Sequence, residues 1–254
     1  MTALDAIFLG ALQGVTEFLP ISSSGHLVLM EEILKISLPV LVFEVTVHMG
    51  TLMSILVVFR QDLRDLLVGL PSRENRMRIL YIILATIPIT VAGLIFKPEI
   101  ERSFHDLQLV GVSLLVTAAA LIATKWFGRE QSALDGKRSI IIGVAQSVAL
   151  LPGISRSGMT IALGLITGLK RREAARFSFL IAIPALIGSG ILTLLDVAES
   201  GASGIPAMVL LAGLGTSFVV GIISLKLLLQ ILEKGRLYYF GFYCFTTGVI
   251  VLGI

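Results

Sequence analysis

The sequence is dominated by apolar segments that are long enough to cross a lipid bilayer. A helix needs about 20 predominantly apolar residues to span roughly 30 Å of hydrocarbon. Six segments come close to this length, and we place them at residues 38–60, 79–96, 107–125, 177–195, 206–228 and 237–254. With 56% hydrophobic and only 15% charged residues, the chain is far more apolar than a soluble domain. The sequence therefore predicts an all-α integral membrane protein with one membrane domain, residues 1–254.

Two further apolar regions, residues 1–36 and 139–168, are interrupted by the runs LPISSSGH and LPGISRSG. Pro, Gly and Ser in such runs break a continuous helix. Non-helical backbone at membrane depth must be buried in protein or line a wet cavity. We therefore expect both regions to be re-entrant helical hairpins, each entering and leaving the membrane on one side.

The distribution of Lys and Arg residues supports this topology. If both interrupted regions are re-entrant, sixteen of the 20 Lys and Arg residues lie on one face, and Arg156 lies inside a broken segment. Only Lys35, Lys97 and Arg102 lie on the other face. The positive-inside rule makes the more basic face cytoplasmic. A nucleic-acid-binding surface would also explain the net charge of +3, but topology explains it more simply, and we expect no nucleic-acid partner.

The two interrupted regions resemble each other in sequence. At an offset of 133 residues, GALQGVTEFLPISSSGH at 10–26 aligns with GVAQSVALLPGISRSGM at 143–159. We infer two repeats, residues 1–126 and 139–254, each with one re-entrant region followed by three spans. Because three crossings separate them, the second repeat enters from the opposite face. The two Ser-rich tips are then expected to meet near the midplane, as in other folds built from discontinuous helices.

The positions at which the two copies differ include all the ionisable groups of the tips. The first copy has Glu17, Ser23 and His26, where the second has Leu150, Arg156 and Met159. A charged side chain costs at least ~2.5 kcal/mol at the centre of a membrane helix, so such residues usually line a cavity and mark function. We therefore take these positions as the candidate site.

The residues at the two tips are suited to binding a phosphate group. Arg156 can hold phosphate oxygens in a bidentate fork. Backbone N–H groups at the start of a helix stabilise anions. The groups expected to form such a cradle belong to Ser22, Ser23, Ser24 and Gly25 in the first tip and to Ser155, Arg156, Ser157 and Gly158 in the second.

The remaining polar residues suggest metal binding and proton transfer. Glu17 would hold Mg²⁺ or Ca²⁺ beside a diphosphate, and Gln13, one turn earlier, could add a carbonyl oxygen. His26 titrates near neutral pH and could move a proton. The nucleophile could be Ser23, Ser24 or a water. Alternatively, the Ser-rich run could serve only close packing of helices.

Glu44 and His48 are additional candidates on the first predicted span. They lie four residues apart and therefore on one face of a helix. Both a role in the site and a mutually satisfied polar pair facing the bundle remain open for them.

The runs GALQGVTEFLPISSSGHL and LLPGISRSGMT resemble the two signature motifs of the bacterial undecaprenyl-diphosphatase family, also called the bacitracin-resistance family. The resemblance extends to FEVTVHMGTL at 43–52 and FSFLIAIPALIGSG at 177–190. It implies hydrolysis of undecaprenyl diphosphate in the bacterial inner membrane, which recycles the lipid carrier of peptidoglycan synthesis and gives bacitracin resistance. It also implies a divalent metal and an active site that opens to the periplasmic face.

The family pattern has Glu or Gln, three residues and then Glu, which Gln13 and Glu17 fill here. By this resemblance, Glu17 is the acidic metal or catalytic residue, His26 the catalytic histidine and Arg156 the phosphate-binding arginine. Residues 22–24 correspond to the active-site hydroxyls. Since Gln13 is uncharged, the resemblance concentrates the negative charge on Glu17.

Two other functional classes remain open from the sequence. A transporter or flippase of polyprenyl phosphate lipids would need Arg156 and the helix ends, but it has little use for Glu17 beside His26. A structural scaffold would tolerate the loss of all three side chains. The expected partners are a polyprenyl diphosphate lipid and membrane lipids, and a homodimer stays among the alternatives.

Overall fold

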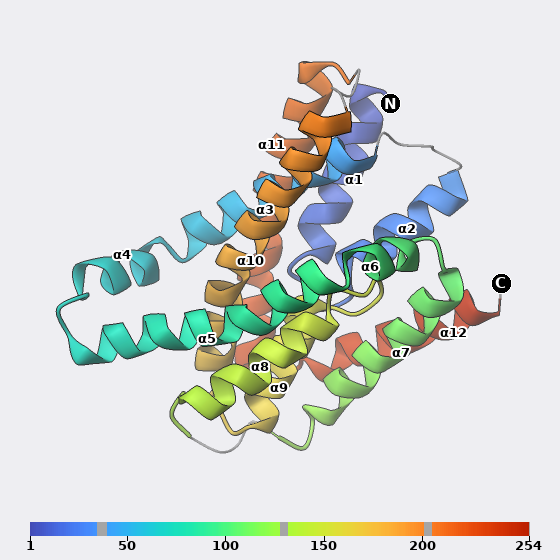
Figure 1. The fold of residues 1–254 in the computed structure, drawn as a ribbon. Helices are drawn as coiled ribbons and strands as arrows, with labels where there is room; N and C mark the ends of the chain where they lie inside the picture. Colours follow the sequence, from blue (N-terminus) through green and yellow to red (C-terminus); the bar gives the residue numbers. More distant parts are fainter. Residues whose placement is uncertain (35–39, 128–131, 201–204, 254) are drawn as a thin grey trace.

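The computed structural model is all-helical over the residues that it describes, 1–34, 40–127, 132–200 and 205–253 (Figure 1). This confirms the predicted all-α class. Lys35, residues 36–39 at the start of the first predicted span and residue 254 lie outside the described residues. Within the described ranges the helices are α1 (Ala3–Thr16), α2 (Ser23–Leu34), α3 (Val40–Val58), α4 (Arg60–Val68), α5 (Arg73–Ile95), α6 (Lys97–Ser103), α7 (Leu107–Ala123), α8 (Gly136–Val148), α9 (Arg156–Ile166), α10 (Arg171–Ser200), α11 (Ala207–Glu233) and α12 (Tyr238–Leu252).

Both Pro- and Ser-rich runs interrupt a helix, as the sequence predicts. The first break separates α1 from α2 and the second separates α8 from α9. Adding 133 to the bounds of α1 gives 136–149, which nearly matches α8, and adding it to those of α2 gives 156–167, which nearly matches α9. The same offset relates α3, α5 and α7 to α10, α11 and α12.

Helices α5, α10 and α11 are each long and apolar enough to cross a membrane. Two further candidates are bent pairs, α3 with α4 at 66° and α6 with α7 at 97°. The described residues thus hold three to five candidate spans, and α12 is shorter, at 15 residues. Only 6% of the apolar window of α5 is buried, so most of this helix is free to face lipid.

Helices α4 and α6 occupy segments that the sequence interpretation treated as loops. Helix α4 has an exposed apolar side, with Leu67 66% and Val68 73% exposed, between polar residues such as Arg60 and Asp65. Such a short amphipathic helix suits the boundary between hydrocarbon and water.

The long helices pack in pairs that follow the repeat. Helix α1 lies along α11, and its counterpart α8 lies along α5 (Figure 1). Helix α3 also packs on α11, and α7 packs on α12. Each broken segment is therefore held against a long helix of the other repeat.

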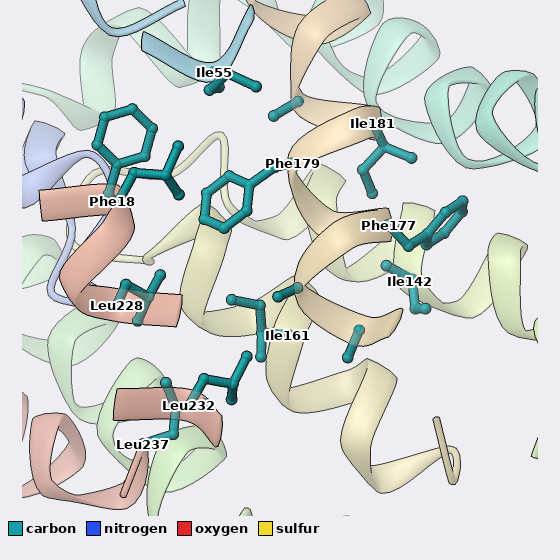
Figure 2. Packing of buried hydrophobic residues seen from close by; sticks show 14 of the residues in the cluster. Phe18, Ile55, Ile142, Ile161, Phe177, Phe179, Ile181, Leu228, Leu232 and Leu237 are labelled. Carbon is teal, nitrogen blue, oxygen red and sulfur yellow. The ribbon is translucent and has the colours of Figure 1, made fainter. Parts of the chain in front are cut away.

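The main hydrophobic core lies next to the first break. Phe18, Ile55 and Phe179 are fully buried and face one another (Figure 2). The ring of Phe179 lies 5.9 Å from that of Phe18 and 5.6 Å from that of Phe59, measured between centroids. Because Phe18 follows Glu17 directly, this aromatic packing fixes the backbone of the first tip.

Glycines allow α1 and α11 to approach closely. A Cβ atom added at Gly10 would lie 2.6 Å from the carbonyl oxygen of Gly213, and one added at Gly14 would lie 2.9 Å from the backbone of α11. Both positions therefore require a residue without a side chain.

The substitution Gly10→Ala is expected to destabilise this helix pair. Overpacking typically costs about 1–3 kcal/mol, and each kcal/mol corresponds to roughly 2–4 °C in the Tm of a domain of this size. Thermal unfolding in detergent measures the effect. Gly215→Ala is the matched control because a Cβ atom at Gly215 meets nothing within 4 Å. An equal Tm for the two variants would contradict the close-packing interpretation.

Candidate active site at the two helix breaks

Glu17 and Arg156 form a buried ion pair between the two tips. Glu17 follows the last residue of α1 and is only 7% exposed, while Arg156 is the first residue of α9. The Arg156 guanidinium donates a hydrogen bond to Oε1 of Glu17. The ion pair thus joins two of the three ionisable side chains that the comparison of the repeats selected, although 139 residues separate them.

The second oxygen of Glu17 accepts two further hydrogen bonds. The Ser23 hydroxyl donates to Oε2 over 2.8 Å, and Nε2 of Gln13 donates to the same atom over 3.1 Å. A buried carboxylate is tolerated only when it is paired and hydrogen-bonded. Glu17 meets this requirement with one residue each from α1, α2 and α9.

His48 of α3 also faces Glu17. Its Nε2 atom lies 3.8 Å from Oε2 of Glu17, and its Nδ1 atom lies 2.8 Å from the backbone carbonyl of Glu44. Because a carbonyl only accepts, Nδ1 carries a proton, and Nε2 forms an ion pair with the carboxylate when it is protonated as well. His48 therefore lies beside the candidate site.

Ser22 connects the two tips through its side chain. Its Oγ atom accepts hydrogen bonds from the backbone N–H groups of Gly25, at 3.2 Å, and Gly153, at 3.1 Å. Its backbone adopts φ +71°, in the left-handed region that non-glycine residues rarely occupy. Strained backbone of this kind persists where surrounding contacts hold it in place.

The second tip is fixed in a similar way. The Ser155 side chain accepts from the N–H group of Gly158 over 3.1 Å and so caps α9. The Ser157 hydroxyl donates over 3.1 Å to the carbonyl of Phe18 in the first tip. The N–H group of Ser155 donates to the Thr117 hydroxyl of α7 over 3.0 Å.

These contacts change the expected anion cradle. The N–H groups of Gly25 and Gly158 are already used by the capping serines, and that of Ser155 is used by Thr117. The first turn of a helix has further N–H groups without a partner inside the helix. Residues 23–24 and 156–157 supply these donors, so they are the members of the expected cradle whose backbone groups can face an anion.

His26 lies one turn beyond Ser23 on α2 but is held by other partners. Its Nδ1 atom lies 2.8 Å from the carbonyl of Ser22, so Nδ1 carries the proton. In the neutral ring, Nε2 then accepts from the hydroxyl of Tyr243 in α12, also over 2.8 Å, and the two rings stack with their planes 13° apart. Within the described residues, no hydrogen bond or ion pair joins His26 to Glu17.

The donor set suits a hard cation only in part. No group of three His, Cys, Asp or Glu side chains that could hold a metal occurs among the described residues. However, Oε1 of Gln13 is buried without a hydrogen-bond partner, next to the Glu17 carboxylate. Mg²⁺ and Ca²⁺ prefer carboxylate and amide oxygens together with phosphate oxygens. The residues therefore fit such an ion if a phosphate completes its ligands.

Removing one member of the ion pair is expected to destabilise the fold. Glu17→Gln leaves Arg156 without its counter-charge, which typically costs about 3–5 kcal/mol, and Arg156→Gln has the converse effect. The double variant should lose much less than the sum of the two single variants, because it removes both charges. Thermal unfolding of the four proteins in detergent measures this coupling. Additive losses would contradict a direct interaction.

Substitutions of Ser22 are expected to separate its backbone role from its hydrogen bonds. Ser22→Ala removes the acceptor for two N–H groups, at about 1–3 kcal/mol, and retains a Cβ atom in the left-handed region. Ser22→Gly removes the same acceptor but relieves about 1–2 kcal/mol of backbone strain. Melting temperatures should therefore fall in the order wild type, Ser22→Gly, Ser22→Ala. A lower Tm for Ser22→Gly than for Ser22→Ala would contradict the strain argument.

Comparison with known proteins gives matches along the whole chain. The family model described as bacitracin resistance protein BacA matches residues 6–250. An undecaprenyl-diphosphatase of Korarchaeum cryptofilum is 44% identical over 100% of both chains. One of Desulfosudis oleivorans is 41% identical over 100% of this chain and 99% of its own, and undecaprenyl-diphosphatase 2 of Bacillus thuringiensis is 38% identical over 98% and 96%. The chain therefore belongs to the bacitracin resistance protein BacA family.

Proposed function

We propose that the protein hydrolyses undecaprenyl diphosphate to undecaprenyl phosphate and inorganic phosphate. The observation that carries this proposal is the Ser23 hydroxyl donating to a buried carboxylate that is also paired with Arg156. Phosphoryl transfer needs a hydroxyl or water as nucleophile, a base such as a carboxylate to accept its proton, and a positive group such as a guanidinium to stabilise the phosphate charge. The names of the relatives, undecaprenyl-diphosphatase, support the same substrate.

Arg156 and the first-turn N–H groups of α2 and α9 would bind the diphosphate. An arginine holds phosphate oxygens in a bidentate fork, and helix N-termini stabilise anions. When Arg156 turns toward the phosphate, Glu17 loses its counter-charge and becomes a better proton acceptor. Substrate binding would thus activate the base in the same step.

Glu17 would accept the proton of the attacking hydroxyl, which belongs to Ser23 or to a water in its place. The new P–O bond forms at the terminal phosphorus, and the bond to the bridging oxygen breaks. The electron pair stays on the departing lipid phosphate. Where Ser23 is the nucleophile, a water would then attack the phosphoserine, and the bond to the Ser23 oxygen would break to release inorganic phosphate. His26, placed between Ser22 and Tyr243, would first take up a second proton at Nε2, in place of the hydrogen bond from Tyr243, and then deliver that proton to the departing oxygen.

We further propose Mg²⁺ or Ca²⁺ as the cofactor, held by Glu17 and by Oε1 of Gln13. When bound, the ion would neutralise negative charge on the diphosphate. His48 would orient the Glu17 carboxylate from the side of α3.

The membrane arrangement that we propose has six crossings and two re-entrant hairpins in an inverted repeat, in the bacterial inner membrane. The isoprenoid tail would remain between helices while the diphosphate reaches the tips from the periplasmic side. The reaction would recycle the lipid carrier of peptidoglycan synthesis and give bacitracin resistance. All residues of the proposed site come from one copy of the chain.

Phosphate release from undecaprenyl diphosphate by purified protein in detergent tests the proposal. Glu17→Gln and Arg156→Lys should each lower kcat/KM at least ~100-fold, the lower range for loss of an acid–base or charge-stabilising group. Chelation of divalent cations should abolish release, and Mg²⁺ or Ca²⁺ should restore it. Arg172→Gln is the matched control because Arg172 is an exposed basic residue outside the site.

Ser23→Ala distinguishes the two nucleophiles. Complete loss of turnover supports the serine, whereas residual metal-dependent turnover supports a water. A well-folded wild type that releases no phosphate would contradict the hydrolase proposal and leave lipid transport as the better hypothesis.

A further inference from the structure

A large cavity lies away from the candidate active site, between α5, α10 and residues 132–134. Its volume is about 770 Å³. The charged residues that line it are Arg73, Glu74, Arg78, Lys170, Glu173 and Arg176. No residue of the candidate active site lines it, so it has no part in the proposed hydrolysis.

Positive charge remains uncompensated in this cavity. Arg78 pairs with Glu74 over 3.2 Å, and Arg176 pairs with Asp62 and, over 3.9 Å, with Glu173. Arg73 and Lys170 form no ion pair with any part of the chain that the structure describes. Four basic residues thus face two acidic ones along the lining.

Backbone dipoles add to this positive potential. Helix α5 begins at Arg73 and α10 begins at Arg171, so both helices start at the cavity. A helix N-terminus carries roughly half a positive charge and favours an anion such as phosphate. The cavity therefore combines two free basic side chains with two helix starts.

The remaining walls of the cavity are apolar and lead into a groove. Met77, Tyr81, Phe177 and Leu180 line the cavity beside the charged groups. Ile82 is shared with a second hollow of about 320 Å³, which continues along α5 to Val91 and is bounded by Pro184 of α10.

The charged part of the cavity and the apolar groove follow each other along α5. Charged residues occupy the start of α5, and the groove follows them as far as Val91, about 27 Å away at 1.5 Å per residue. Isoleucines and threonines line most of this groove, and Ile83 and Ile87 are about half exposed. A fitting ligand has an anionic head and a long apolar chain beside it.

We propose that this cavity and groove bind an anionic glycerophospholipid of the cytoplasmic leaflet. The phosphate contacts Arg73 and Lys170 at the helix starts, and one acyl chain lies in the groove between α5 and α10. The lining loops carry much of the basic excess that the positive-inside rule assigns to the cytoplasm. Anionic lipids of that leaflet attract such residues at the membrane surface.

Native mass spectrometry of the full chain tests this proposal, using mixed micelles that contain phosphatidylglycerol and phosphatidylcholine in equal amounts. Wild type should retain one phosphatidylglycerol in preference to phosphatidylcholine. The double variant Arg73→Gln, Lys170→Gln should lower that preference about 10- to 30-fold, because each basic residue near the membrane surface adds to the attraction of anionic lipid. Arg64→Gln with Lys234→Gln removes the same charge from exposed positions outside the cavity and should leave the preference unchanged.

A second pair of variants tests the groove. Ile83→Trp fills the groove and should lower lipid retention, whereas Leu94→Trp, at an exposed position of α5 beyond the groove, should not. Equal loss in both charge variants would show general surface attraction and overturn the proposal. Normal retention in Ile83→Trp would show that only a phosphate is bound, and it would overturn the proposal as well.

Discussion

The ion pair between Glu17 and Arg156 is the interaction on which the arrangement of the two tips depends. Either charge alone would be expensive to bury, because an unpaired ion in a low-dielectric interior costs several kcal/mol. The two residues come from different repeats, so neither hairpin can satisfy its own charge. The tips therefore have to meet, and the hydrogen bonds from the Gly153 N–H group to Ser22 and from the Ser157 hydroxyl to Phe18 hold them together.

The contacts between the two tips explain how a site with charged and polar side chains can lie inside an apolar helical bundle. Close packing brings α1 against α11 at glycine positions, and the aromatic contact of Phe18 with Phe179 fixes the chain beside Glu17. The polar groups around Glu17 that the structure describes are hydrogen-bonded to one another, whereas Oε1 of Gln13 has no hydrogen-bond partner. Because this oxygen lies next to the Glu17 carboxylate, it could serve as a ligand for a bound cation.

Sequence alone could predict the features that follow from local pattern. The Pro- and Ser-rich runs mark both helix breaks, and the repeat offset of 133 selects Glu17, His26 and Arg156 as the asymmetric positions. It could not pair Tyr243 with His26, because this contact joins residues 217 positions apart through the packing of α12. Nor could it show that Gly25 and Gly158 donate to capping serines, since side-chain rotamers decide that.

The positive charge of the basic residues relates the proposed membrane orientation of the chain to the lipid that we propose for the cavity between α5 and α10. Basic residues stay on the cytoplasmic side during insertion, and anionic headgroups on that side attract them afterwards. Arg73 and Lys170 belong to the basic set that we propose to lie on the cytoplasmic side, yet among the described residues no carboxylate neutralises them. In the interior of the bundle, Glu17 neutralises Arg156. At the surface a lipid can take the place of the carboxylate, so these two charges need no partner within the chain.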